Sequence, residues 1–273
     1  MTARIRIAIA GTGGRMGQAL VARVLEADDL ALASALDVAG AATVGRDAGA
    51  ALGRSSGVAV TSEVDAALAG ADVLIDFTRP EGTLAHAAAC ARAGVALVAG
   101  TTGLTAAHKS AIADHARTVP IVLSANMSVG VNVLAELVTR AARALGSAYD
   151  IEVVEMHHRH KVDAPSGTAL MLGEAAARGA GIDLASAGVY AREGVTGERK
   201  PGTIGFATLR GGDVVGEHVV VFAGTGERVE LAHRATSRQM FADGALRAAR
   251  FAAAARRERR AGLFDMRDVL GLA

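Results

Sequence analysis

Three of the chain's eight histidines lie within four positions of one short basic segment, in the stretch EMHHRHKVDAPSGTAL at residues 155–170. The run consists of His157, His158, Arg159, His160 and Lys161. Imidazoles titrate near neutral pH, so they can accept or donate protons in catalysis, and as neutral rings they can bind metals. Four uses of this run are open: a metal site, a nucleic-acid patch, a solvated basic surface, or a pocket for an anionic substrate.

The first three uses are each weakened by a feature of the chain. A zinc site built on His158 and His160 would need further ligands at a recognisable spacing, and the neighbouring guanidinium and ammonium groups would oppose a dication. A nucleic-acid surface requires a broad basic face with stacking aromatic residues. The chain instead has 29 basic against 28 acidic residues and only 3% aromatics. A solvated basic run remains open, because charge runs are usually exposed.

Two features favour a pocket for an anionic substrate. Ser166, Gly167 and Thr168 open a predicted helix, and the N–H groups and hydroxyls at such a start can bind a carboxylate. Only three of the 29 basic residues are lysine, and one of them is Lys161. Arginine cannot give up its proton at working pH, whereas lysine can, so a lysine in this segment suggests a proton donor. We therefore interpret the run as an acid–base cluster that also binds a dianion.

A glycine-rich turn, GTGGRMG at residues 11–17, separates a predicted strand from a predicted helix. Glycines there let the backbone approach a pyrophosphate, and the N–H groups at the helix start favour its charge. The spacing departs from G-x-G-x-x-G because Met16 takes the place of the third glycine. Asp37 follows 20 residues after Gly17, where an acidic residue can bind the ribose hydroxyls of NAD. Together these residues predict a dinucleotide site, although a structural turn would also explain the glycines alone.

Strands and helices alternate through the first half of the chain. Apolar strands are predicted at 4–11, 30–37, 58–60, 72–78, 95–102 and 120–126, with helices between them. The alternation predicts an α/β fold, a Rossmann-like doubly wound parallel sheet. The segments AGTTG at 99–103 and SANMSVG at 124–130 end two of these strands, at the edge where open α/β sheets bind ligands. Either segment could instead be an ordinary turn with a Ser or Thr cap.

The pattern changes after a long helix predicted near 129–145. Strands at 151–157, 203–210, 214–222 and 227–235, with one helix at 167–181, predict an α+β domain with a mostly antiparallel open sheet. The Gly-rich, charged loop 191–202 is expected to be mobile. We place a dinucleotide-binding domain at 1–127 and a substrate-binding and tetramerisation domain at 128–236. A last helix is predicted at 237–260, and the C-terminal helical segment 237–273 is expected to complete the first domain.

Composition excludes other classes of protein. The net charge is +1, and no uninterrupted apolar run approaches the roughly 20 residues of a membrane helix. The single cysteine, Cys90, rules out a disulfide within the chain and suits a reducing compartment. The apolar stretch in MTARIRIAIAG is too short for a signal peptide. We expect a soluble cytoplasmic protein that binds neither nucleic acid nor membranes.

The chain resembles the 4-hydroxy-tetrahydrodipicolinate reductase family, formerly called dihydrodipicolinate reductase. The resemblance rests on GTGGRMG, on EMHHRHKVDAPSGTAL and on IGFATLRGGDVVGEHVVVFAGTGERVELAHRATSR at 204–238, and it covers essentially the whole chain. It implies reduction of a cyclic dicarboxylate imine in the diaminopimelate branch of lysine biosynthesis, with hydride from NADH or NADPH. It also implies a homotetramer assembled through the sheet of the second domain.

The resemblance also implies roles for individual residues. His157 is similar to the acid–base histidine of the family, and Lys161 to its proton donor. The contacts to substrate carboxylates match His158, Gly167 and Thr168. The cofactor contacts match Gly11, Thr12, Gly13, Gly14, Arg15, Met16, Asp37, Gly100, Thr101, Thr102, Ser124, Ala125, Asn126 and Met127. A hydride-reduced imine develops negative charge at its nitrogen, so a nearby cation stabilises the transition state and delivers the proton.

One position departs from the family pattern and bears on the choice of cofactor. Many members follow the acidic residue with an arginine that can hold the 2′-phosphate of NADPH, whereas here Val38 follows Asp37. Arg15 in the glycine-rich turn could still reach a phosphate. We expect both cofactors to be used, with NADH at least as good as NADPH. A nucleotide sensor, a metal-dependent hydrolase or a 2-hydroxy-acid dehydrogenase would explain only parts of the pattern.

Overall fold

The structure is a computed structural model that describes residues 3–272 of the chain. It divides into two compact units. The first unit comprises Met1–Ser128 and Gln239–Ala273, and the second comprises Val129–Arg238. Among the described residues, no helix is both long enough and apolar enough to cross a membrane.

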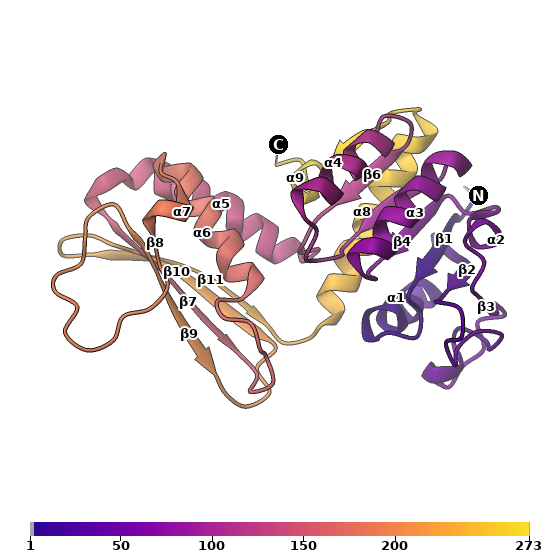
Figure 1. Cartoon of the computed structure of the whole chain (residues 1–273), viewed down its shortest axis with the longest axis horizontal. Coiled ribbons are helices and arrows are strands. Elements are labelled where there is room, and N and C mark those ends of the chain that lie inside the picture. Colours follow the sequence, from indigo (N-terminus) through magenta and orange to yellow (C-terminus); the bar gives the residue numbers. More distant parts are fainter. Residues whose placement is uncertain (1–2, 273) are drawn as a thin grey trace. The chain divides into compact units, whose positions relative to one another are not determined.

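A parallel sheet, seven-stranded within residues 3–272, forms the centre of the first unit (Figure 1). Its strands are β1 (Ile5–Ala10), β2 (Leu30–Leu36), β3 (Val60–Thr61), β4 (Val73–Asp76), β5 (Ala96–Ala99), β6 (Pro120–Leu123) and β12 (Gly262–Phe264). Their order is β12-β6-β5-β4-β1-β2-β3, with every pairing parallel. The central strands β4 and β5 are buried along their whole length, as expected where helices cover both faces. The predicted Rossmann-like doubly wound sheet is confirmed.

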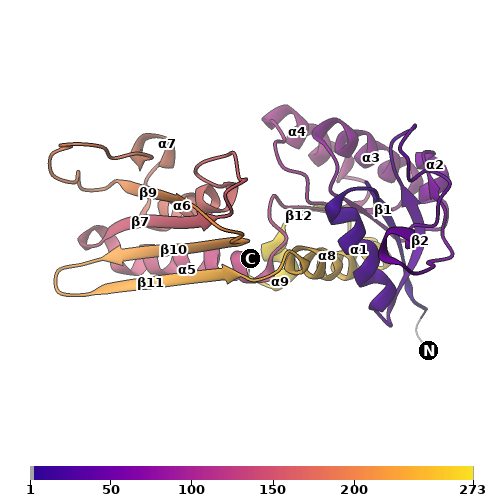
Figure 2. The same cartoon turned by 90° about the horizontal axis from the view of Figure 1, so that it is seen from below.

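Helices cover the two faces of this sheet (Figure 2). One face carries α1 (Arg15–Glu26) and α8 (Gln239–Arg257), which pack against each other. The other carries α2 (Val64–Leu68), α3 (Pro80–Ala93) and α4 (Ala106–His115), and a 3₁₀ turn lies at Ala50–Leu52. Helix α8 packs closely because its buried residues are small. A Cβ atom at Gly244 would lie only 1.7 Å from the carbonyl oxygen of Met127.

The C-terminal segment 237–273 contains the helix predicted at 237–260, but the prediction that the segment is helical to its end is wrong. Helix α8 ends at Arg257, Arg259 takes a positive φ of 53°, and the chain continues as β12 and α9 (Met266–Leu270). The guanidinium of Arg260 lies over the rings of Phe251 and Phe264, with its Cζ atom 5.4 and 5.5 Å from their centroids. Pairing with β6 stabilises β12, whose three residues are too few to show a strand period.

The second unit contains a mixed sheet, five-stranded within the described part of the chain. Its strands are β7 (Asp150–His157), β8 (Gly188–Val189), β9 (Ile204–Arg210), β10 (Gly216–Ala223) and β11 (Arg228–Ala235), in the order β11-β10-β7-β9-β8. The pairings of β10 with β7 and β11 are antiparallel, which confirms the mostly antiparallel sheet. Strands β7 and β9 pair in parallel, and α6 (Gly167–Ala180) and α7 (Leu184–Ala187) lie in the crossover that this pairing requires.

Helices α5 (Val129–Leu145) and α6 cover one face of this sheet, and a 3₁₀ turn at Gly146–Ala148 follows α5. Along β7 the buried residues alternate with half-buried ones, so one face points into the core. That alternation directs Glu155 and His157 to the same side as Ile151 and Val153. Strand β10 brings His218 opposite Glu155 in the register. Three polar side chains thus enter a core that is otherwise apolar.

The loop 191–202 is mostly exposed and contains no regular structure. Arg192 and Arg199 nevertheless bind the carboxylate of Glu152 on β7, at 2.8 and 3.0 Å. The mobility of this loop stays a prediction.

Candidate functional site

The carboxyl ends of the parallel strands place the predicted cofactor residues along one edge of the first sheet. Residues 11–16 follow β1, Asp37 follows β2, residues 100–102 follow β5, and residues 124–127 follow β6. Because parallel strands all end at the same edge, these segments lie where open α/β sheets bind ligands. The groups at β1 and β5 are separated by β4, so they form two parts of one edge.

The glycine-rich turn is shaped by close contact between β1 and α1. Gly11 has a φ of 73°, in the left-handed region that favours glycine. A Cβ atom at Gly17 would lie 2.1 Å from the carbonyl oxygen of Gly11. Gly17 therefore performs the packing role of the third glycine, one position later than in the usual motif. Gly14 begins α1 without a side-chain cap, which suits N–H groups that bind an anion.

Asp37 is held against this turn. Its Oδ2 atom accepts hydrogen bonds from the amide of Gly13 at 2.8 Å and from the Thr43 hydroxyl at 3.0 Å. Its Oδ1 atom accepts one from the amide of Val38 at 2.9 Å. The Val38 side chain is 72% exposed, and Arg15 is also exposed. The structure thus brings Asp37 and the glycine-rich turn together, as the spacing predicted.

A buried carboxylate–histidine pair at the end of β4 was not predicted. Asp76 is fully buried and lies 3.0 Å from Nδ1 of His86, and it accepts a hydrogen bond from the amide of Thr78 at 2.7 Å. Burial favours the neutral carboxyl, but the hydrogen bonds from His86 and Thr78 outweigh it and lower the pKa of Asp76. The sequence signal was an aspartate inside the apolar run DVLIDFT, because a buried charge needs a partner.

The segment after β5 is fixed by packing as well as by turns. A Cβ atom at Gly100 would lie 2.2 Å from the ring of Phe77, so only glycine fits there. The hydroxyl of Thr101 accepts a hydrogen bond from the hydroxyl of Thr83 at 2.7 Å in the interior. After β6, the hydroxyl of Ser124 donates to the carbonyl of Asn126 at 2.8 Å, and Met127 is buried.

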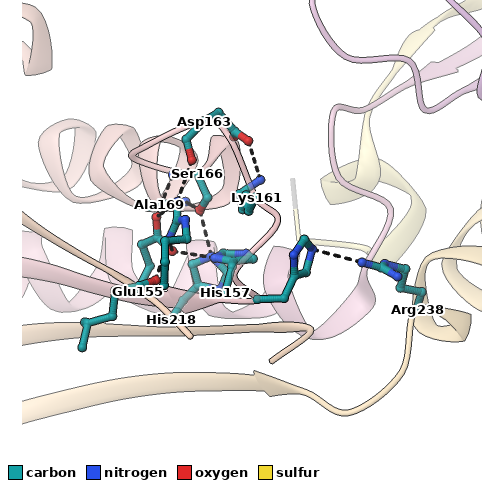
Figure 3. A network of polar contacts seen from close by, with 11 residues as sticks. Glu155, His157, Lys161, Asp163, Ser166, Ala169, His218 and Arg238 are labelled. Carbon is teal, nitrogen blue, oxygen red and sulfur yellow. Dashed lines mark hydrogen bonds and ion pairs between the residues drawn. The ribbon is translucent and has the colours of Figure 1, made fainter. Parts of the chain in front are cut away.

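Glu155, His157 and His218 form a buried polar cluster in the second unit (Figure 3). Nδ1 of His157 lies 2.5 Å from Oε2 of Glu155. The rings of His157 and His218 meet edge to face, with centroids 5.0 Å apart and planes at 75°. Gly216 leaves room for this arrangement, since a Cβ atom there would lie 2.9 Å from Nε2 of His157.

Ser166 joins this cluster to the start of α6. Its hydroxyl accepts a hydrogen bond from the amide of Ala169 at 3.1 Å, and it lies 3.1 Å from Nε2 of His218 (Figure 3). The helix begins at Gly167, which confirms the predicted start. N–H groups in the first turn of a helix have no carbonyl acceptor within the helix, so the turn formed by Gly167 and Thr168 favours an anion.

Lys161 follows the cluster in a loop and is one-fifth exposed. Its Nζ atom lies 2.9 Å from Oδ1 of Asp163 (Figure 3). Burial raises the pKa of Asp163, but the hydrogen bond from Lys161, together with the charges of Lys161 and Arg210 and a backbone hydrogen bond, outweighs burial and lowers that pKa. The structure therefore gives Lys161 a carboxylate partner that the sequence pattern did not indicate.

His158 points to a different partner from His157. Its Nε2 atom lies 3.2 Å from Nη2 of Arg238, and its Nδ1 atom is buried without a hydrogen-bond partner among the described residues. Burial lowers the pKa of His158, and the charge of Arg238 lowers it further. The exposed ring of His160 lies 6.2 Å from that of His158. Within residues 3–272, no group of three His, Cys, Asp or Glu side chains could hold a metal ion.

The two buried histidines are neutral at neutral pH. Burial, with a smaller effect of the nearby His157, lowers the pKa of His218 to about 3. Burial also lowers the pKa of His157, despite the opposing effect of Glu155. Lys161 and Arg210 add to the lowering at His157. A neutral imidazole beside an ammonium is suited to proton transfer.

Three functional candidates near the cluster were missed from sequence: Glu155, Arg210 and His218. Strand alternation held the signal for two of them. Glu155 shares its parity with Val153, and His218 with Val220, so both point into the core. Arg210 ends β9 beside His157, which only the strand register reveals.

Comparisons with known proteins cover both units. A family model described as the N-terminus of dihydrodipicolinate reductase matches residues 5–127, and one described as its C-terminus matches residues 130–270. The 4-hydroxy-tetrahydrodipicolinate reductase of Cupriavidus necator is 59% identical over 98% of this chain and 100% of its own length. That of Thiobacillus denitrificans is 59% identical over 98% and 99%.

A solved structure shares the fold. The dipicolinate-bound dihydrodipicolinate reductase from Paenisporosarcina sp. TG-14 superposes with a TM-score of 0.74 at 23% identity, over 96% of this chain and 97% of that one. The two family models together span nearly the whole chain, and the curated relatives match from end to end. The chain therefore belongs to the dihydrodipicolinate reductase family of oxidoreductases.

Proposed function

We propose that this chain reduces 4-hydroxy-tetrahydrodipicolinate to tetrahydrodipicolinate in the diaminopimelate route to lysine. Curated relatives of that name, matched over their full length, support the reaction. The observation that carries the proposal is the juxtaposition of a buried neutral imidazole, His157, with the ammonium of Lys161 in the loop that leads to α6. In the net reaction hydride replaces the 4-hydroxyl group, which leaves as water, so one proton is consumed, and this pair can supply it.

The substrate's two carboxylates match the donors around this pair. His158 and the exposed guanidinium of Arg238 lie together on one side. The first turn of α6, at Gly167 and Thr168, offers backbone N–H groups on another. A dianion that bound both would be fixed at two points, and its ring would be oriented for reaction.

The first unit fits a nicotinamide dinucleotide. The glycine-rich turn and the uncapped start of α1 suit a pyrophosphate, and Asp37 lies beside that turn, where it can accept hydrogen bonds from ribose hydroxyls. Reduced nicotinamide supplies the hydride when bound. Because Val38 places no cation beside Asp37, we propose that NADH serves at least as well as NADPH.

We propose that Lys161 donates the proton. Its ammonium has three N–H donors, and the carboxylate of Asp163 holds it in place at 2.9 Å. His157, being neutral at neutral pH, serves as the acid–base partner that positions the proton.

A homotetramer built on the second sheet is proposed from the face opposite α5 and α6. That face carries a continuous apolar row: Val154, Met156, Ala207, Leu209 and Val219. Leu209 is 47% exposed in the single chain. A large exposed apolar patch marks an interaction surface. Light scattering should therefore report four chains, and a monomer at assay concentration would contradict this. A cytoplasmic location stays a prediction.

The reaction is tested by following the near-ultraviolet absorbance of NADH or NADPH, with substrate made in the cuvette from pyruvate and aspartate semialdehyde by the preceding synthase. We expect oxidation that depends on the synthase. A metal chelator should leave the rate of cofactor oxidation unchanged, which would distinguish the proposed reductase from a metal-dependent hydrolase. Folded protein that oxidises neither cofactor would refute the proposed function.

A further inference from the structure

Both oxygens of the Glu155 carboxylate are occupied by hydrogen-bond donors. Oε1 accepts from the amide of Ser166 at 3.0 Å and from Nη2 of Arg210 at 3.0 Å. Oε2 accepts from Nη1 of Arg210 at 2.8 Å and lies 2.5 Å from Nδ1 of His157. The side chain is 1% exposed, so these contacts are shielded from water. A two-pronged guanidinium contact of this kind is among the strongest pairings of charged groups in proteins.

These contacts fix which atom holds the shared hydrogen. Burial raises the pKa of Glu155, but the bonds from Arg210, His157 and Ser166 outweigh burial and lower it. An ionised carboxylate can only accept hydrogen bonds. The hydrogen between Glu155 and His157 must therefore sit on Nδ1 of His157. In a neutral imidazole, the other nitrogen then carries a lone pair.

We propose that Glu155 and Arg210 form a positioning pair that holds His157 as the neutral tautomer with its proton on Nδ1 and its lone pair on Nε2. The inference deepens the proposed function and rests on it, because it concerns the histidine assigned to that reaction. Glu155 is buried behind His157. It acts through His157.

Arg210 explains why the carboxylate does not convert His157 into an imidazolium. A carboxylate alone would stabilise the charged ring, as in many histidine–carboxylate pairs. Here a permanent cation binds both oxygens of that carboxylate and offsets its charge. The other groups that face His157 are His218 on β10, which is neutral, and the cationic Lys161 in the loop, and neither of these favours a positive ring.

This tautomer gives His157 and Lys161 different roles in proton transfer. Nε2 of His157 cannot donate a proton while the ring is neutral, so the proton comes from the ammonium of Lys161. Nε2 can instead accept a hydrogen bond from an ammonium or from water. Gly216 keeps the space at Nε2 open, since any larger residue would place a Cβ atom 2.9 Å from it.

Glu155→Gln tests the pair, and Glu152→Gln is its matched control. Both glutamates lie on β7 and bind arginine, but Glu152 points to the opposite face and is 26% exposed. A glutamine amide can donate to Nδ1 of His157 and so permit the other tautomer. We expect kcat to fall by about 100-fold or more, as for other histidines held in the wrong tautomer, with KM changed by less than about threefold. Glu152→Gln should keep kcat within about twofold, with the oligomeric state checked in parallel.

Nitrogen-15 NMR of the imidazole groups reports the tautomer directly, with the signal of His157 assigned by its loss in His157→Gln. We expect the wild-type protein at neutral pH to show a protonated Nδ1 and a bare Nε2, and Glu155→Gln to lose that preference. A wild-type His157 with its proton on Nε2, or charged, would overturn the proposal, as would wild-type kcat in Glu155→Gln. The wild-type spectrum needs neither a variant nor activity. Loss of reductase activity from the wild type would count instead against the proposed function.

Discussion

The two units each bury one histidine against one carboxylate, and the pairs are built differently. In the first unit, Nδ1 of His86 lies 3.0 Å from Asp76, and the described donors to Asp76 are His86 and Thr78. In the second, Nδ1 of His157 lies 2.5 Å from Glu155, and Arg210 binds both oxygens of that carboxylate. Both pairs therefore join an imidazole to a carboxylate, but only the second includes an arginine.

The arginine is the difference that matters. Asp76 has His86 as its side-chain partner, so removal of the histidine leaves a buried carboxylate with only the Thr78 amide as a described donor. Glu155 keeps a cation whatever happens to His157. The first pair is thus a structural element at the end of β4, whereas the second holds its histidine as a neutral ring whose Nε2 atom can accept a hydrogen bond. A lysine lies beside the second pair and not beside the first among the described contacts.

The largest effect should follow removal of that lysine. Lys161→Ala is expected to lower kcat by about 10²- to 10⁴-fold, the usual contribution of a positioned acid. Lys200→Ala, in the exposed loop 191–202, is the matched control and should change kcat little. Steady-state kinetics and circular dichroism on both variants decide this. Small and equal losses would remove Lys161 from the role of proton donor.

Loss of the first histidine should destabilise the fold rather than slow a proton transfer. His86→Ala is expected to lower the free energy of unfolding by about 3 kcal/mol, because Asp76 remains buried and loses its histidine partner. Urea unfolding monitored by circular dichroism measures this. His86→Ala/Asp76→Ala, which removes both side chains of the pair, should recover part of the loss. Unchanged stability in the single variant would contradict the structural role of the pair.

His218 should make stability depend on pH. Its folded-state pKa of about 3 lies below the ordinary value of 6.5, so between these values the unfolded chain binds a proton that the folded chain excludes. The neutral His218 therefore leaves the free energy of unfolding undiminished above pH 6.5. Below that value the free energy of unfolding falls by about 1.4 kcal/mol per pH unit as the pH is lowered towards 3. Urea unfolding at several pH values should show a shallower slope for His218→Gln than for wild type. His115→Gln, in the first unit, serves as the control, and parallel slopes for wild type and His218→Gln would refute the assignment.

The smallest effect concerns cofactor choice. Val38→Arg should raise kcat/KM for NADPH by about tenfold, because a guanidinium beside Asp37 can bind the 2′-phosphate. The NADH value should change much less. A marked NADPH preference in the wild type would show that Arg15, or another cation, already binds that phosphate.

Much of the fold followed from residue patterns because its signals are local. The alternation of apolar strands with helices predicted the parallel sheet, and Ser166 before GTAL predicted the start of α6. Strand β12 was missed because three residues carry no period and its partner β6 lies far away in the chain. The run of three histidines at 157–160 also predicted the segment in which the site lies.

The supporting residues of the site could not be found in the same way. Arg210 reaches Glu155 from a strand 55 positions away, and Asp163 binds Lys161 across a loop whose shape the sequence does not fix. Strand parity carried a signal for Glu155 and His218 as inward-facing polar residues, but neither was predicted. Their partners depend on the register of β7 with β9 and β10, which is a property of the folded sheet.

The most direct test of the reductase assignment follows the hydrogen itself. NADH carrying deuterium at the transferred position of the nicotinamide ring is incubated with the protein and with freshly made 4-hydroxy-tetrahydrodipicolinate, and the product is examined by mass spectrometry. We predict tetrahydrodipicolinate that contains one deuterium from the cofactor, formed much more slowly by Lys161→Ala. Product without deuterium, or no product from folded wild-type protein, would contradict hydride transfer by this chain.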